Sequence, residues 1–177
     1  MSAEGRAHNV GDVSEKRSPK CRANAAYAKL AYSQQAWLDE SHEYFYMNDE
    51  GDEVAGLVEG TRTLIWDVRE PEDPIMVGEY VADSPATDHN LYIVGDRMYQ
   101  SNYRSGLHVF DISDRENIER IAYFDTVPWG DDAGMGDIVS GAIGSWSNYP
   151  FFESGVIVFT SMREGLFVVR KARQPIL

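Results

Sequence analysis

Two segments of this chain, Leu64–Tyr80 (LIWDVREPEDPIMVGEY) and His108–Phe124 (HVFDISDRENIERIAYF), carry the same pattern at an offset of 44 residues. Each begins with an apolar strand that ends in an aspartate, Asp67 or Asp111. A charged turn follows, and a second apolar strand then closes on an aromatic residue. An aspartate after a strand accepts backbone N–H groups of the next turn, so we expect a structural role for both aspartates.

Short apolar segments separated by polar turns extend this pattern on both sides of the repeat. They form three groups, at about residues 31–82, 86–125 and 145–177, and the last group lacks a fourth strand. Four-stranded units at a spacing of about 45 to 60 residues are typical of propeller blades, which must stack to bury their faces. The sequence therefore predicts an all-β fold over 31–177: a partial β-propeller of about three four-stranded antiparallel blades, the last incomplete.

About three blades are fewer than the four to eight of a closed propeller. An open stack leaves apolar blade faces and strand edges uncovered. We therefore expect a fragment of a longer protein, and we expect the fragment to self-associate through its open blade faces. Residues 1–30 are rich in Ser, Ala, Gly and charge without apolar periodicity, which predicts a poorly ordered leader.

The composition limits the classes of partner. The chain has 16 Lys and Arg against 29 Asp and Glu, a net charge of −13. Such an acidic body repels phosphate backbones, so we expect no nucleic acid partner. No apolar run approaches the roughly 20 residues of a membrane helix. The single cysteine, Cys21, excludes an intrachain disulfide, and the N-terminus shows no signal-peptide pattern.

Several motifs, taken together and in order, resemble the choice-of-anchor B family and its LVIVD-type repeats: Ser33–Leu38, Thr61–Val68, Ala86–Tyr92, Tyr99–Leu107, Phe110–Asp114 and Gly144–Pro150. Members of this family are bacterial and archaeal β-propeller proteins, mostly exported and tethered to the cell surface. The resemblance covers about residues 31–171. It implies an extracellular or cell-surface location and no established reaction.

Polar residues open the first strand of each predicted unit: Gln34, Gln35, His89, Asn90, Ser147 and Asn148. The first strand of a blade lines the central channel, so these side chains are expected to converge at one mouth of it. Amide and imidazole groups there would hold a small polar ligand or a metal. The alternative interpretation is that they satisfy neighbouring backbone groups, as buried polar groups must.

Two acidic loops suggest a weak cation site. Asp49 and Asp52 lie in the first loop, and Asp131 and Asp132 lie in the second. Calcium takes six to eight oxygen ligands, often from such loops. The other interpretation is that both loops are simply solvated. Beyond this calcium hypothesis, we predict no cofactor.

No motif in the chain predicts a particular reaction. A nucleophile elbow, a P-loop, a zinc motif and a dinucleotide fingerprint are all missing from the sequence. We therefore predict a non-catalytic binding or scaffold module, with no catalytic residue, whose partner is a small polar ligand or a surface protein. The alternative is a metal-dependent, hydrolase-like enzyme that uses His89 and the amides of the channel mouth.

Overall fold

The computed structural model describes residues 2–4, 7–129 and 143–172, and within them all regular structure is β. The strands are β1 (Ser2–Glu4), β2 (Ala7–Asp12), β3 (Lys20–Ala25), β4 (Ser33–Leu38), β5 (Tyr44–Asp49), β6 (Arg62–Asp67), β7 (Ile75–Val81), β8 (Asn90–Val94), β9 (Arg97–Asn102), β10 (Gly106–Asp111), β11 (Glu119–Phe124), β12 (Ser145–Tyr149), β13 (Val156–Ser161) and β14 (Gly165–Arg170). No helix in this part of the chain is long and apolar enough to cross a membrane.

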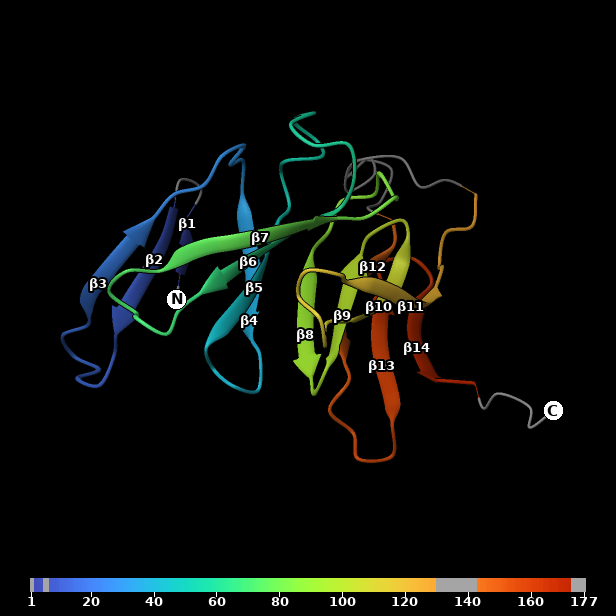
Figure 1. The fold of residues 1–177 in the computed structure, drawn as a ribbon. Helices are drawn as coiled ribbons and strands as arrows, with labels where there is room; N and C mark the ends of the chain where they lie inside the picture. Colours follow the sequence, from blue (N-terminus) through green and yellow to red (C-terminus); the bar gives the residue numbers. More distant parts are fainter. Residues whose placement is uncertain (1, 5–6, 130–142, 173–177) are drawn as a thin grey trace.

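Consecutive strands pair in antiparallel fashion into four small sheets: β1–β3, β4–β7, β8–β11 and β12–β14. From the sheet β1–β3 the other sheets follow side by side in chain order towards the C-terminus (Figure 1). Their first strands approach one another, because β1 contacts β4, β4 contacts β8, and β8 contacts β12. This arrangement confirms the predicted all-β fold of propeller-like sheets, with the first strand of each sheet on the inner side.

The repeat seen in the sequence is also a structural repeat. The β6–β7 pair has a register shift between Ile65 and Trp66, and β10–β11 has one at the equivalent place, between Val109 and Phe110. The structural role predicted for the two aspartates is confirmed. Asp67 accepts the backbone N–H of Arg69 at 3.1 Å, and Asp111 accepts that of Ser113 at 3.0 Å.

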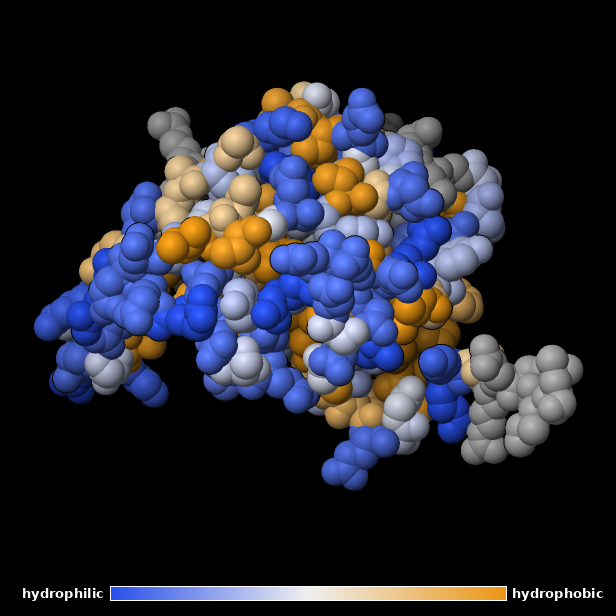
Figure 2. Space-filling view, in the orientation of Figure 1, coloured by the Kyte–Doolittle hydropathy of each residue, from blue (hydrophilic) through white to orange (hydrophobic). Residues whose placement is uncertain are grey.

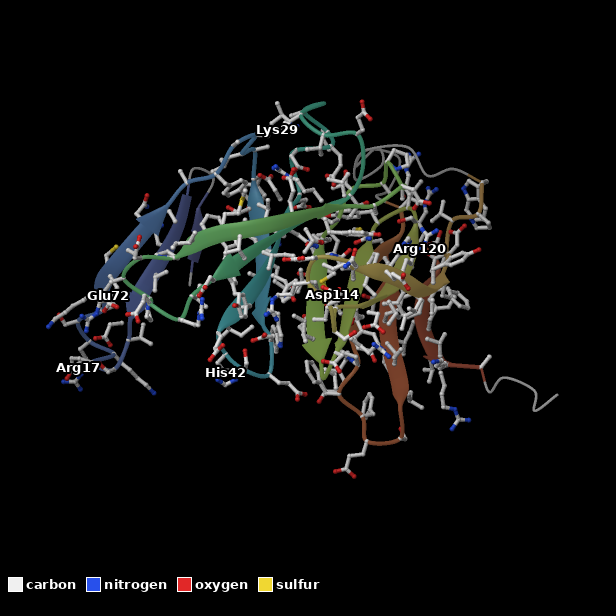
Figure 3. All side chains as sticks on the ribbon, viewed as in Figure 1. Arg17, Lys29, His42, Glu72, Asp114 and Arg120 are labelled. Atoms are coloured by element: carbon white, nitrogen blue, oxygen red, sulfur yellow. The ribbon has the colours of Figure 1, made fainter. Side chains whose placement is uncertain are left out.

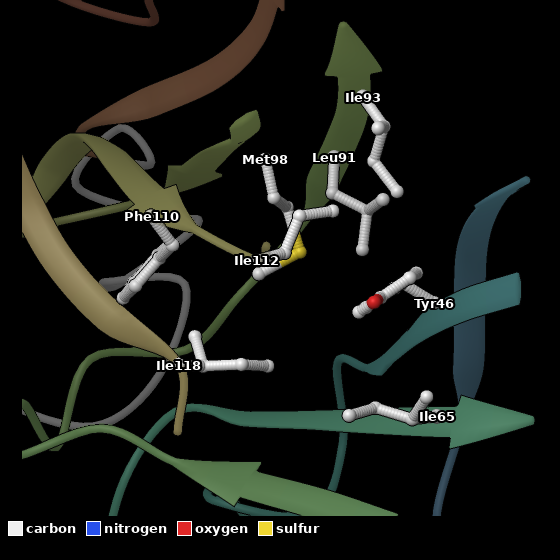
Figure 4. Packing of buried hydrophobic residues seen from close by; sticks show 8 residues of the cluster. All are labelled: Tyr46, Ile65, Leu91, Ile93, Met98, Phe110, Ile112 and Ile118. Atoms are coloured by element: carbon white, nitrogen blue, oxygen red, sulfur yellow. The ribbon is translucent and has the colours of Figure 1, made fainter. Parts of the chain in front are cut away.

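The main core lies between the sheets β4–β7 and β8–β11. Figure 4 shows its members: Tyr46, Ile65, Leu91, Ile93, Met98, Phe110, Ile112 and Ile118. The opposite face of β4–β7 carries a second cluster, Phe45, Met47, Leu64 and Trp66, which packs against residues that include Ala25 and Tyr27. Neighbouring residues on a strand point to opposite faces, so β5 and β6 supply both clusters. Trp66 and Phe110 each face the preceding part of the chain.

Residues 1–30 differ from the predicted leader, because the described part of this segment contains β1, β2 and β3. Lys20–Arg22 are exposed, and a charged pair, Arg22 with Asp12 at 2.5 Å, bridges β3 and β2. This sheet relies on backbone pairing more than on apolar burial, which is why apolar periodicity did not reveal it. The following residues are tied down, since Ala28 and Lys29 carbonyls accept hydrogen bonds from Arg62.

The core between the two central sheets predicts a large effect of truncation at Phe110, which is fully buried. We expect Phe110→Ala to lower the free energy of unfolding by about 3–5 kcal/mol, because it removes a ring and leaves a cavity. The control is Ile75→Ala on the exposed side of β7, with an expected change within roughly 0.5 kcal/mol. Urea unfolding monitored by circular dichroism measures both, and equal losses would contradict this core assignment.

Candidate functional site: the mouth of the inner strands

The approach of the inner strands brings together three of the six predicted mouth residues, with Gln34 and Asn90 beside the His89 imidazole. His89 Nδ1 donates to the carbonyl oxygen of Trp146 at 2.5 Å, and Asn90 Nδ2 donates to the same oxygen at 2.8 Å. Gln34 Nε2 lies 3.4 Å from His89 Nε2. Asn90 Nδ2 also lies 2.7 Å from His89 Nδ1, so each ring nitrogen has a close amide neighbour.

A carboxylate and a phenol complete the surroundings of His89. Glu50 Oε1 lies 4.0 Å from His89 Nε2, and the hydroxyl of Tyr103 donates to the same carboxylate oxygen. The ring of Trp146 covers the imidazole at a centroid distance of 4.2 Å. His89 is only 3% exposed, so the imidazole lies beneath Trp146 and not on an open channel wall.

The other three mouth residues serve contacts between sheets. Gln35 Oε1 accepts the backbone N–H of Leu91 at 2.8 Å, which links β4 to β8. Asn148 donates to Ser101 Oγ at 3.0 Å, and Ser147 Oγ lies 3.2 Å from the hydroxyl of Tyr92. In the structure these side chains therefore hold neighbouring sheets together, and ligand binding at the mouth stays a prediction.

The first acidic loop is buried, not solvated. Asp49 accepts hydrogen bonds from the hydroxyl of Tyr27 at 2.7 Å and from the backbone N–H groups of Ala31 and Tyr32 at 2.8 and 2.5 Å. Asp52 forms an ion pair with Arg62 at 2.7 Å, and both side chains are almost fully buried. The loop thus anchors the segment before β4 to the sheet β4–β7.

The described residues show no group of three His, Cys, Asp or Glu side chains that could hold a metal ion. Asp49 and Asp52 have the protein partners given above. Asp131 and Asp132, the other half of the calcium hypothesis, lie outside the described residues. The cation site therefore stays a prediction, and the geometry offers it no support at the first loop.

Sequence reasoning missed a cluster of buried carboxyl groups beside this loop. Burial and the neighbouring Asp52 carboxylate raise the pKa of Glu53 to about 9, and burial raises that of Asp52 to about 6. Asp88 is fully buried, neither of its oxygens has a hydrogen-bond partner within the described structure, and its pKa lies well above the usual range because of that burial. The acidic stretch at residues 49–53 was the signal for this cluster in the sequence. Its burial could not be predicted, because it depends on how the sheets pack.

The last sheet carries a second feature that the sequence alone did not locate. Leu166 and Val168 are equivalent to Leu107 and Val109 at the offset of 59 residues. The earlier pair is covered by the sheet β12–β14 and is 2% and 9% exposed, whereas Leu166 and Val168 are 66% and 65% exposed. Tyr149 is half exposed. It lies on the same face as Val168, because Tyr149 pairs with Val158 and Val158 pairs with Val168. We call Tyr149, Val158, Leu166 and Val168 the end face.

Comparison with known proteins supports the fold. No protein-family model matches the chain, and no curated protein matches it. The solved structure of the periplasmic gluconolactonase PpgL of Pseudomonas aeruginosa is similar, with a TM-score of 0.64 and 12% sequence identity. The match covers 88% of this chain and 43% of that one, so the chain spans less than half of its structural relative. The chain thus has a β-propeller-like fold, and at this identity the likeness concerns the fold alone.

The raised pKa of Glu53 predicts that stability falls with increasing pH. The folded state holds this proton up to about pH 9, whereas the unfolded chain releases it near the ordinary pKa of 4.5. The contribution of the protonated Glu53 carboxyl to the free energy of unfolding is therefore complete below about pH 4.5, and it is lost as the pH rises towards 9. We expect Glu53→Gln to be more stable than the wild type at pH 9 by at least about 1 kcal/mol, the value of one pKa unit.

Urea unfolding at pH 5, 7 and 9 measures this effect. The exposed Glu59→Gln is the matched control, and its stability should follow that of the wild type at each pH. A wild-type protein whose stability is unchanged between pH 5 and 9, or a Glu53→Gln variant that follows the wild type, would contradict the prediction.

The contacts of Asn148 predict a structural role that needs no ligand. We expect Asn148→Ala to lower the free energy of unfolding by about 1–2 kcal/mol, because it leaves buried groups on β9 without a partner. Ser147→Ala, which changes a more exposed side chain, should cost less. Chemical denaturation of purified protein without added ligand measures both, and an unchanged stability of Asn148→Ala would refute the role.

Proposed function

We propose that the chain is a non-catalytic binding or scaffold module of the choice-of-anchor B and LVIVD-repeat type, and that it engages its partner through the end face. The observation that supports this proposal is the exposure of Leu166 and Val168, whose repeat equivalents are buried beneath the following sheet. The extracellular or cell-surface location implied by the family resemblance is part of the same proposal.

The end face fits another sheet better than it fits a small molecule. Its residues lie on three neighbouring strands in register, Tyr149 on β12, Val158 on β13 and Val168 on β14. Within the chain, the equivalent face of β8–β11 accepts a sheet that contributes Phe159 and Phe167, stacked at a centroid distance of 5.0 Å. A partner with an apolar sheet face would continue this packing.

The two ends of the stack differ in chemistry. The first sheet exposes charged residues, and Arg17 and Glu72 lie at that end of the molecule (Figure 3). In stacked-repeat proteins a terminal repeat with a polar outer face acts as a cap. With one apolar end and one charged end, two copies would join end face to end face about a two-fold axis. A second copy of the chain is therefore the partner that we propose.

The alternative, a metal-dependent hydrolase-like enzyme, has one supporting observation. The imidazole of His89, the carboxylate of Glu50 and the phenol of Tyr103 lie together at the mouth. However, His89 is buried and both of its ring nitrogens have close neighbours. Zinc or manganese measured at one atom per chain in purified protein, and lost in His89→Ala, would favour this alternative.

The proposal predicts a dimer that depends on the end face. In sedimentation velocity over a hundredfold range of concentration, we expect the wild type to dimerise. The double variant Leu166→Lys and Val168→Lys should be monomeric, because two charges would be buried at the contact. The matched control is Ile75→Lys with Val77→Lys, two exposed residues of β7.

Circular dichroism of both double variants separates loss of association from loss of folding. A wild type that remains monomeric at every concentration would overturn the proposed partner. Dimerisation that survives the end-face variant but not the β7 variant would place the contact elsewhere.

A further inference from the structure

A separate cavity lies between the last two sheets, away from the mouth and from the end face. It has a volume of about 860 Å³ and is bounded by β9–β11 on one side and by β13 and β14 on the other. Its apolar lining includes Leu107, Val109, Phe124, Ile157 and Val169. Val169 points to the opposite side of β14 from Val168, so the cavity and the end face lie on different faces of this sheet.

The cavity follows from a mismatch in the number of strands. The sheet β8–β11 has four strands, whereas the described part of the next sheet has three. The outer strand β11 is therefore only partly covered: Phe124 packs against Phe159 and Phe167, with ring centroids 5.7 and 5.4 Å apart, and it remains 40% exposed. Figure 2 shows hydrophobic residues gathered over these last two sheets, next to hydrophilic ones.

The charged residues that line the cavity all have the same sign. They are Arg97, Arg120, Arg170 and Lys171, and the lining has no Asp or Glu, although the chain as a whole has a net charge of −13. Arg97 is paired with Asp111 at 2.5 Å, and Arg120 with Asp83 at 3.2 Å. Within the described residues, Arg170 and Lys171 show no ion pair and no hydrogen bond from their side chains.

We propose that this cavity binds an amphipathic anion, namely an acyl chain of about ten to twelve carbons with a carboxylate head. The apolar lining would take the chain, and Lys171, which by alternation follows Val169 on the cavity side, would bind the carboxylate with Arg170 beside it at the end of β14. Ligand sites of this kind are mostly apolar, with a few placed polar groups, and have volumes of about 300–1,000 Å³. A cationic rim on an otherwise acidic protein selects the sign of the head group.

Three ligands with the same tail test this proposal on the full chain: dodecanoate, dodecanol and dodecylammonium, each below its critical micelle concentration. Isothermal titration calorimetry should show dodecanoate binding at least tenfold more tightly than dodecanol, with no measurable binding of dodecylammonium. Decanoate should bind about tenfold more weakly than dodecanoate, because two buried methylene groups are lost. Equal affinities for the three head groups, or no binding of dodecanoate, would overturn the proposal.

Two variants assign the site. Arg170→Glu with Lys171→Glu should remove the preference for dodecanoate over dodecanol, while Lys16→Glu with Arg17→Glu, remote and exposed, should keep it. Ala122→Trp, which adds a ring at the exposed lining of β11, should weaken dodecanoate and dodecanol alike. Unchanged binding in both cavity variants would place the ligand elsewhere and refute the assignment.

The proposal does not depend on dimerisation. The monomeric variant Leu166→Lys with Val168→Lys carries its changes on the other face of β14 and should still bind dodecanoate. Loss of binding in that variant, with folding intact, would show that the cavity needs the partner copy and would contradict the site as described.

Discussion

Face-to-face packing of small sheets is the interaction on which the rest of this structure depends. A single sheet of three or four short strands has two faces and cannot bury either by itself. The chain resolves this by giving β5 and β6 apolar residues on both sides, with Tyr46 and Ile65 facing the next sheet and Phe45 and Trp66 facing the previous one. Each inner sheet thereby packs against two neighbours, whereas each terminal sheet has one face that no other sheet of the described structure covers.

The polar groups near the inner strands follow from the same packing. Once the inner strands are close together, the amides of Gln35 and Asn148 meet the backbone or side chains of a neighbouring sheet and hold it. Burial of polar groups is tolerated where they are paired, as Asp52 is by Arg62. Asp88 has no hydrogen-bond partner within the described structure, and Glu53 accepts the backbone N–H of Arg62 but lies beside the Asp52 carboxylate, so the raised pKa of each carboxyl group expresses the cost of burial.

Much of the fold could be predicted from the sequence, but the arrangement of the candidate site could not. The turn aspartates Asp67 and Asp111, the hairpins around them and the inner position of the first strands were all predicted from local pattern. The sheet β1–β3 was missed because β3, with Lys20–Arg22 exposed, shows little apolar alternation. The predicted mouth residues lie on the inner strands or, for His89, directly before β8, yet their division into a His89 group and a set of sheet-to-sheet links depends on distances between strands.

What the sequence alone determined is the repeating unit, because alternation along a strand and the chemistry of a turn act over a few neighbouring residues. Leu107 and Leu166 occupy equivalent positions in that unit, and the sequence pattern around them does not distinguish the two. Only the tertiary structure decided that the first is buried and the second exposed, and that four basic residues surround one cavity. Those outcomes depend on which sheet stacks on which, a property of contacts between residues far apart in the chain.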